Sequence, residues 1–179
     1  MSASPFAGRR LPVAVLGATG TVGQVFIRLL AEHPWFRVTT VAASERSAGK
    51  RYADATRWHE GTMPADVADL EVTRCHPDDV REPVVFSALD SAAALEAEPL
   101  FAQAGAVVLS NAKSYRMAED VPLLIPEVNP DHLGLLDVQR ARRGWSGAIV
   151  TNPNCSTINI VMALAPLDRA FGLRKLFAV

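Results

Sequence analysis

Short apolar runs alternate with helix-like segments along most of the chain. Runs of apolar and β-branched residues predict strands at residues 13–16, 37–43, 70–74, 84–87, 106–109 and 148–150. Helices are predicted at residues 91–103, 130–143 and 156–171 from their periodicity and their Gly or Pro boundaries. Strand–helix alternation is typical of a parallel sheet covered by helices, so we predict an α/β fold with a doubly wound parallel sheet.

A further helix follows the first strand and is predicted from one apolar stripe. The stripe consists of Val22, Val25, Phe26, Leu29 and Leu30, at i, i+3, i+4, i+7, i+8 spacing. His33 and Pro34 then end the helix. Residues 45–66 are polar and predict a long loop. Residues 173–179 read as a strand that is just beginning, which indicates the N-terminal part of a longer polypeptide or, alternatively, a natural edge strand.

The composition excludes several classes of protein. With 49% hydrophobic and 21% charged residues, the chain is typical of a globular protein and unlike a disordered or repetitive one. A net charge of −1 disfavours nucleic-acid binding, and no apolar run reaches the length of a membrane span. Residues 1–10 form a predicted flexible tail without the apolar core of a secretory signal. Two cysteines make no disulfide framework, so we expect a cytoplasmic protein.

A glycine turn of the form G-x-x-G-x-x-G joins the first strand to the first helix. Gly17 tolerates an unusual backbone at the turn, Gly20 lets a pyrophosphate approach, and Gly23 lets the helix pack closely. The helix N-terminus adds N–H groups for phosphates. We therefore predict a Rossmann-type dinucleotide site, against the alternative of a structural turn that binds nothing. The expected cofactor contacts are Gly17, Thr19, Gly20, Thr21, Val22 and Gly23.

The end of the second strand bears on the choice of cofactor. Ser44, Arg46 and Ser47, followed by Lys50, offer hydroxyls and positive charge that suit a 2′-phosphate. We therefore predict NADP rather than NAD. Glu45 leaves NAD open, because an acidic residue at this place binds the ribose 2′-hydroxyl. Arg46 also fits the alternative of a solvated surface charge.

Cys155 follows the last predicted strand and falls near the start of the last helix. The helix dipole and N–H groups at such a position lower a thiol pKa and stabilise a thiolate. From the residues alone, a nucleophile and a buried core cysteine are equally open. Cys75 and His76 are neighbours whose side chains would point to opposite faces of a strand, so we expect no metal site.

Five motifs occur together in one order along the chain. They are GATGTVG at 17–23, ASERSAGK at 43–50, VLSNAKSYRM at 108–117, VPLLIPEVNP at 121–130 and NPNCSTI at 152–158. The set resembles the aspartate-β-semialdehyde dehydrogenases of the archaeal and fungal branch, over residues 11–179. The resemblance implies NADPH-dependent reduction of L-aspartyl-4-phosphate to L-aspartate 4-semialdehyde with release of phosphate, a step in lysine, threonine and methionine biosynthesis.

The resemblance also implies roles for individual residues. Cys155 matches the nucleophile, which forms a thioester with the substrate, and Asn154 matches the neighbour that helps to hold the substrate. Arg116 matches the phosphate-binding arginine, because a planar fork of donors suits a phosphate dianion. Lys113 and Ser114 are expected to assist Arg116.

The loop after residues 84–87 matches the segment near the nicotinamide, with expected contacts from Ala88 and Leu89. It departs from the family at Asp90, where Pro is common, and the added carboxylate is expected to alter the cofactor fit. The family's general-base His and substrate-carboxylate Arg lie in a second domain and match no residue of this sequence.

The resemblance divides the chain into three expected parts. Residues 1–10 are the tail, residues 11–152 the NADP-binding Rossmann domain, and residues 153–179 the start of an α+β catalytic and dimerisation domain. Because the general base is missing from this sequence, we expect the chain to be inactive alone. Members of the family are homodimers or homotetramers, and we expect the same of a full-length form. Three alternatives stay open: a malonyl-CoA reductase, an N-acetyl-γ-glutamyl-phosphate reductase, and an NADP-binding module without turnover.

Overall fold

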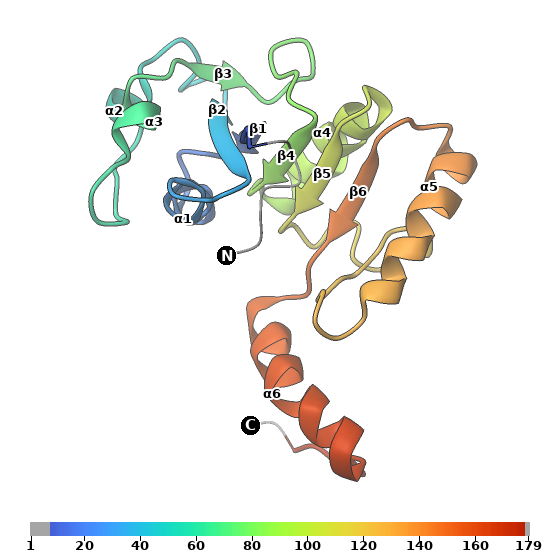
Figure 1. Ribbon diagram of the computed structural model, residues 1–179. Helices are drawn as coiled ribbons and strands as arrows, with labels where there is room; N and C mark the ends of the chain where they lie inside the picture. Colours follow the sequence, from blue (N-terminus) through green and yellow to red (C-terminus); the bar gives the residue numbers. More distant parts are fainter. Residues whose placement is uncertain (1–7, 178–179) are drawn as a thin grey trace.

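Six parallel strands form one sheet in the order β3-β2-β1-β4-β5-β6 (Figure 1). The computed structural model describes residues 8–177, so residues 1–7 of the expected tail lie outside the described part. The strands are β1 (Leu11–Leu16), β2 (Phe36–Ala43), β3 (Val72–Arg74), β4 (Val84–Ser87), β5 (Val107–Ser110) and β6 (Ala148–Thr151). The sheet confirms the predicted α/β class and its Rossmann-type strand order.

Helices connect the strands and cover both faces of the sheet. They are α1 (Thr21–Leu30), α2 (Tyr52–Ala55), α3 (Ala65–Ala68), α4 (Ser91–Gln103), the 3₁₀ turn η1 (Pro130–Gly134), α5 (Leu135–Arg143) and α6 (Cys155–Phe171). The central strand β1 is buried on both sides. Val13 and Val15 belong to a core shared with α1, α2 and α3, whereas Ala14 and Leu16 belong to a core shared with α4. Consecutive side chains of one strand therefore fill two separate cores.

The face that α1 buries differs from the predicted one. Gly23, Ile27 and Leu30 are buried, whereas Val22 and Leu29 are 41% and 57% exposed. The predicted stripe is therefore wrong for these two residues. The difference arises because α1 packs closely on the glycine turn at Gly23, where there is no room for a side chain.

The polar stretch 45–66 contains more structure than the predicted loop. It includes α2 and the start of α3, and it buries Tyr52 in the core on the α1 side, which Val67 of α3 joins just beyond the stretch. Strand β3 is correspondingly shorter than predicted. Residue Leu70 accepts a hydrogen bond from the Tyr52 backbone, and Glu71 forms an antiparallel bridge with Arg51. Residues 50–52, near the start of the stretch, are thus paired with residues 70–72, where β3 begins.

Helix α6 leaves the sheet and extends away from it (Figure 1). It has no buried residue, and Phe171 is 83% exposed. Arg169 Nη2 donates to the carbonyls of Glu127 and Val128, both at 3.1 Å. The predicted strand at 173–179 is wrong for residues 173–177, which are irregular because no strand of the described chain lies beside them; residues 178–179 fall outside the described part.

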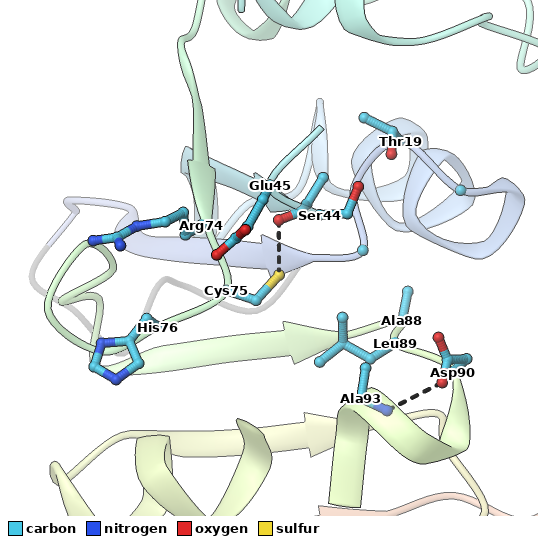
Figure 2. Close-up of a pocket in the computed structure, with 13 residues that line it drawn as sticks. Thr19, Ser44, Glu45, Arg74, Cys75, His76, Ala88, Leu89, Asp90 and Ala93 are labelled. Atoms are coloured by element: carbon cyan, nitrogen blue, oxygen red, sulfur yellow. Dashed lines mark hydrogen bonds between the residues drawn. The ribbon is translucent and has the colours of Figure 1, made fainter. Parts of the chain in front are cut away.

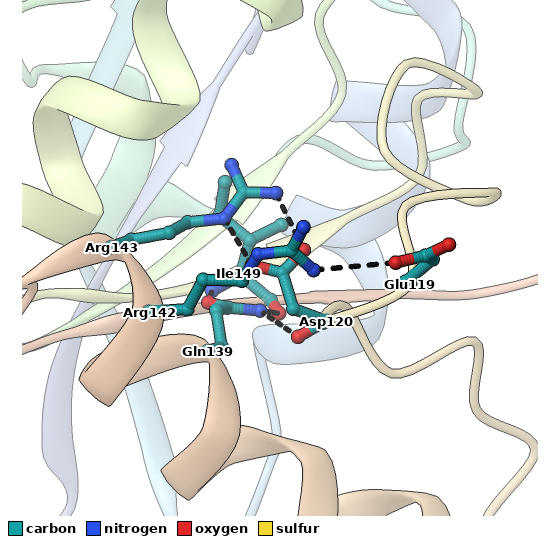
Figure 3. A network of polar contacts seen from close by, with 6 residues as sticks. All are labelled: Glu119, Asp120, Gln139, Arg142, Arg143 and Ile149. Carbon is teal, nitrogen blue, oxygen red and sulfur yellow. Dashed lines mark hydrogen bonds and ion pairs between the residues drawn. The ribbon is translucent and has the colours of Figure 1, made fainter.

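A charged cluster joins the segment that follows β5 to α5 (Figure 3). Arg143 donates from Nε to Asp120 Oδ2 and from Nη2 to Asp120 Oδ1, the second at 2.6 Å. The Arg143 guanidinium also lies 4.9 Å from the ring centroid of Trp145. Buried Gln139 donates to the carbonyls of Asp120 and Ile149, both at 3.0 Å. The Asp120 side chain is 4% exposed, so its charge depends on Arg143 for compensation.

Replacing Asp120 with asparagine is expected to lower the free energy of unfolding by about 2–3 kcal/mol at pH 7, because a buried pair is broken while Arg143 keeps partial access to water. Arg143 holds the pKa of Asp120 below its usual value. The stabilisation is therefore complete above the unfolded-state pKa of about 3.9 and is lost as the pH falls through the lower folded-state pKa. Urea unfolding of both proteins from pH 3 to pH 7 measures this difference.

The neighbouring ion pair provides a matched control for Asp120→Asn. Glu119 and Arg142 lie 3.4 Å apart, and their side chains are 86% and 62% exposed. Glu119→Gln is expected to change stability by less than about 0.5 kcal/mol at every pH. Equal effects of the two substitutions would contradict the role assigned to burial.

Candidate active site

The glycine turn between β1 and α1 is shaped by two close backbone approaches. Gly17 has φ +69°, and a Cβ there would lie 2.6 Å from the carbonyl oxygen of Ala88. A Cβ on Gly23 would lie 2.3 Å from the carbonyl oxygen of Gly17. Gly20 differs, because its φ is −80° and a Cβ would meet only the Gly17 oxygen, at 3.3 Å. The protein itself therefore requires glycine at 17 and 23, whereas at Gly20 the missing side chain leaves room beside the cavity.

A cavity of about 520 Å³ opens at this turn, at the carboxyl ends of β1, β2, β3 and β4 (Figure 2). Its size is that of a small-molecule site, and its position is the crevice where parallel sheets bind ligands. The residues that line it are Gly17, Thr19, Gly20, Ala43, Ser44, Glu45, Arg74, Cys75, His76, Ala88, Leu89, Asp90 and Ala93.

Most of the expected cofactor residues lie at this cavity or directly beside it. Those in the lining are Gly17, Thr19, Gly20, Ser44, Ala88 and Leu89. Thr21 and Val22 begin α1 and are exposed, and Gly23 is buried beneath the turn. Arg46 and Ser47 are absent from the lining. Arg46 is exposed two residues beyond Ser44, in a turn where Ser47 N donates to Ser44 O at 2.8 Å.

The sequence analysis missed the contribution of the loop after β3. Arg74 donates to Asp79 at 2.7 and 3.2 Å, which lowers the pKa of Asp79. Glu45 lies beside Arg74 in the cavity lining, and His76 adds an imidazole (Figure 2). The strand order would have predicted that these residues lie at the cavity, because β3 pairs with β2 in parallel and so ends beside it.

The two cysteines lie in different environments. Cys75 is partly buried in the cavity wall, its Sγ lies 3.6 Å from the Ala43 carbonyl oxygen, and burial raises the pKa of its thiol. Cys155 is exposed and is the first residue of α6. Asn154 is the N-cap of that helix, and its Oδ1 accepts a hydrogen bond from Thr157 N at 2.8 Å. The core-cysteine alternative therefore does not apply to Cys155 in the described residues.

Asp90 has a structural role that explains a carboxylate at this place. It is the N-cap of α4, and its Oδ1 accepts hydrogen bonds from Ala92 N at 2.9 Å and Ala93 N at 3.1 Å (Figure 2). The helix N-terminus compensates the negative charge. Asp90 also lines the cavity, so its carboxylate is present at the site while it is held by α4.

The loop after β5 is anchored at its start and in its middle. Ser110 Oγ donates to buried Glu98 at 2.6 Å and accepts from Ala112 N at 3.1 Å. Burial raises the pKa of Glu98. Ser114 Oγ donates to the Ser91 carbonyl at 2.6 Å, which ties the loop to α4. Lys113 is exposed.

Arg116 lies in this loop with part of its donor capacity unused. Its Nη2 donates to the Asn111 carbonyl at 2.8 Å, whereas its Nε is buried and has no partner among the described residues. Asn152 Nδ2 donates to Asn111 Oδ1 at 2.9 Å. Since β5 and β6 are neighbours in register, the loop that holds Arg116 lies beside the loop that leads to Cys155. The structure thus brings these two predicted substrate loops together.

Comparison with known proteins gives the family. Residues 12–136 match the family described as semialdehyde dehydrogenase, NAD binding domain. The chain belongs to the semialdehyde dehydrogenase family. The predicted resemblance is confirmed at this level.

Similar proteins within this family are named aspartate-semialdehyde dehydrogenase. The aspartate-semialdehyde dehydrogenase of Archaeoglobus fulgidus is 58% identical over 166 residues, which cover 92% of this chain and 48% of that protein. The Schizosaccharomyces pombe enzyme of the same name is 47% identical, over 89% of this chain and 46% of that protein. This chain therefore spans about half the length of the curated relatives it matches.

Solved semialdehyde dehydrogenase structures have the same fold. The Candida albicans aspartate semialdehyde dehydrogenase with NADP matches with a TM-score of 0.83 and 43% identity, over 92% of this chain and 48% of that one. The Vibrio cholerae aspartate semialdehyde dehydrogenase II complexed with ASA matches with a TM-score of 0.69 and 32% identity, over 92% of this chain and 48% of that one.

The described residues of this semialdehyde dehydrogenase contain neither a candidate membrane-spanning helix nor a candidate metal cluster. Between residues 8 and 177, no helix is both long and apolar enough to span a bilayer. The same residues contain no group of three or more His, Cys, Asp or Glu side chains placed to hold a metal ion.

Proposed function

We propose that this chain forms the NADP(H)-binding domain of an aspartate-semialdehyde dehydrogenase and provides its nucleophile, Cys155. The enzyme would reduce L-aspartyl-4-phosphate to L-aspartate 4-semialdehyde and release phosphate. One observation carries the proposal: the glycine-turn cavity and Cys155 follow strands of one parallel sheet, so both lie at its carboxyl edge. The 58% identity to a relative of that name supports the choice of substrate.

The cavity fits a dinucleotide on its own geometry. The packing of the protein does not require glycine at position 20, so the space beside Gly20 is available to a pyrophosphate. The N-terminus of α1 lies at the same turn and adds N–H donors. Ser44 lines the cavity at the end of β2 and would bind the ribose 2′-position there, and exposed Arg46, two residues further on, would bind a 2′-phosphate. These two side chains support NADP, which also appears with the Candida albicans relative.

Cys155 is placed for nucleophilic attack. As the first residue of α6 it lies at the positive end of the helix dipole, and Asn154 caps the same turn. Its thiolate would attack the carbonyl carbon of the acyl phosphate, expel phosphate and form a thioester. NADPH supplies the hydride that reduces this thioester. Collapse of the resulting thiohemiacetal releases the aldehyde and restores the thiolate.

Arg116 would bind the substrate phosphate. Its guanidinium is fixed through Nη2, and its buried Nε offers a donor that an anionic oxygen would satisfy. Lys113 adds positive charge from the exposed side of the loop. Ser114 supports Arg116 indirectly, because its hydroxyl is engaged with Ser91.

Residues 153–179 would open the catalytic and dimerisation domain. Helix α6 supports this division, since it carries exposed apolar residues away from the sheet. The general-base His, the substrate-carboxylate Arg and homodimer or homotetramer formation are proposed to belong to that second domain. A cytoplasmic location is proposed with them.

The two thiols are expected to differ in reactivity. Iodoacetamide should alkylate Cys155 at least about tenfold faster than Cys75 at pH 7.5, because thiolate fraction and exposure set the rate. The measurement is mass spectrometry of the folded chain over time, with Cys155→Ala and Cys75→Ala variants to assign the peptides. Equal rates in the folded chain would count against Cys155 as the nucleophile.

The proposed activity is tested in the direction of NADP reduction. The chain receives aspartate semialdehyde, phosphate and NADP, and NADPH absorbance is followed, with Cys155→Ala as the control. We expect this chain to bind NADP detectably and to turn over little substrate. We expect a polypeptide spanning the relatives' full length to show turnover that depends on Cys155. Absence of NADP(H) binding would overturn the cofactor role. Turnover that survives in Cys155→Ala would overturn the role of the nucleophile.

A further inference from the structure

The carbonyl groups of the glycine turn are held by side chains from elsewhere in the chain. Tyr52, the first residue of α2, donates from its hydroxyl to the Ala18 carbonyl at 2.7 Å. The Tyr52 side chain is fully buried. Ala18 lies thirty-four positions before Tyr52 in the sequence, so this hydrogen bond depends on the tertiary fold.

The next carbonyl of the turn has two such donors. Gln24 Nε2 lies 3.2 Å from the Thr19 carbonyl, and Thr56 Oγ1 lies 3.3 Å from the same oxygen. Gln24 is 3% exposed, and its Oε1 accepts from His59 N at 2.8 Å while its Nε2 donates to the Arg57 carbonyl at 3.0 Å. The excursion that follows β2 is thus bound to the turn through Gln24 and Thr56.

These bonds determine which polar groups of the turn remain for a ligand. A trans peptide is planar, and its C=O and N–H point in opposite directions. Holding the Ala18 and Thr19 carbonyls toward Tyr52, Gln24 and Thr56 turns the following N–H groups the other way. The N–H of Gly20 closes the turn on the Gly17 carbonyl at 3.0 Å. The N–H of Thr19 shares its peptide plane with the Ala18 carbonyl and so points away from Tyr52, and Thr19 is one of the residues that line the cavity.

We propose that Tyr52, Thr56 and Gln24 are positioning residues for cofactor binding, which hold the turn so that a pyrophosphate meets N–H donors rather than carbonyl oxygens. This inference rests on the proposed function, because it needs a dinucleotide in the cavity. None of the three side chains lines that cavity, so each acts through the backbone of the turn. Loss of an anchor lets a carbonyl rotate toward the phosphate, where like charges repel.

Tyr52 and Thr56 can be tested by changes that remove one hydroxyl and little else. Tyr52→Phe keeps the ring, which packs edge-on against Trp58 with centroids 6.4 Å apart. Thr56→Val keeps the branched shape, and Thr56→Ser keeps the hydroxyl as a conservative rescue. The pKa of Tyr52 is raised to about 12 by burial, so the phenol remains a donor throughout the accessible pH range.

The experiment compares two ligands on each protein. NADPH contains the pyrophosphate, whereas adenosine 2′-monophosphate contains the adenosine and 2′-phosphate without it. Dissociation constants are measured by calorimetry for the unmodified chain, Tyr52→Phe, Thr56→Val and Thr56→Ser. NADPH affinity is expected to fall about tenfold in Tyr52→Phe and roughly fivefold in Thr56→Val, the effect of one hydrogen bond each. Thr56→Ser should recover most of the loss.

Adenosine 2′-monophosphate separates positioning from general damage. Its affinity should stay within about twofold of the unmodified chain in every variant, because it does not reach the turn. A parallel loss for both ligands would overturn the inference, since that result indicates a disturbed domain. Unchanged NADPH affinity in the variants would overturn it as well. Failure of the unmodified chain to bind NADPH would instead overturn the proposed function, and the inference with it.

Discussion

Replacement of Cys155 by serine is expected to lower the turnover of the proposed dehydrogenase by a factor on the order of 10⁶, as loss of the nucleophile does in other covalent enzymes. A serine hydroxyl at the start of α6 would remain protonated at neutral pH, and helix dipole stabilisation cannot compensate for its high pKa. The measurement is steady-state NADPH absorbance with a polypeptide spanning the relatives' full length.

NADPH binding is the control for Cys155→Ser. The cavity at the glycine turn does not include Cys155, so the dissociation constant for NADPH should remain within about twofold. Loss of turnover with intact binding assigns the defect to the chemical step. Turnover near the original rate would require a nucleophile other than Cys155.

Replacement of Gly23 by alanine is expected to destabilise the fold by about 3 kcal/mol or more, because the new methyl would meet backbone atoms that cannot move independently. The nearest are the Gly17 oxygen at 2.3 Å and the Ala18 Cα at 2.7 Å. A loss of this size corresponds to a fall in melting temperature of about 10 °C for a chain of this length. Thermal unfolding followed by circular dichroism measures it.

Gly20→Ala is the matched variant in the same turn. Its backbone angle suits alanine, and its Cβ would have one contact, at 3.3 Å. The melting temperature should change by less than about 2 °C, while NADPH affinity falls on the order of tenfold because the methyl occupies the approach of the pyrophosphate. If Gly20→Ala lowered the melting temperature as much as Gly23→Ala does, the turn would need glycine at position 20 for folding.

The elements were predictable where local sequence determines them. The apolar runs predicted all six strands of the sheet to within two residues at either end, because a parallel strand buried on both faces shows as an apolar run. The face of α1 was not predictable from apolar side chains alone. Its buried face includes Gly23 and Gln24 beside Ile27 and Leu30, and the first two contribute nothing to an apolar stripe.

The residues of the candidate site that directly follow a predicted strand were predictable, and those that tertiary contacts bring to it were not. The glycine turn, Ser44 and Cys155 each follow a strand, and the sequence shows this directly. Arg74 and His76 entered the cavity because β3 pairs with β2, and that pairing depends on crossover geometry rather than on local pattern. The anchors Tyr52 and Gln24 were missed for the same reason, since each contacts a distant part of the chain.

The strand order also governs when the sheet can assemble during synthesis. Strand β1 pairs with β2 on one side and with β4 on the other, so its second edge has no partner until β4 has been made. About 70 residues separate the two strands, and at a ribosomal rate of 5–20 residues per second the delay is roughly 4–14 s. During that interval the apolar edge of β1 is open to wrong pairing. We therefore expect the yield of this domain to rise when residues 11–43 are protected during synthesis.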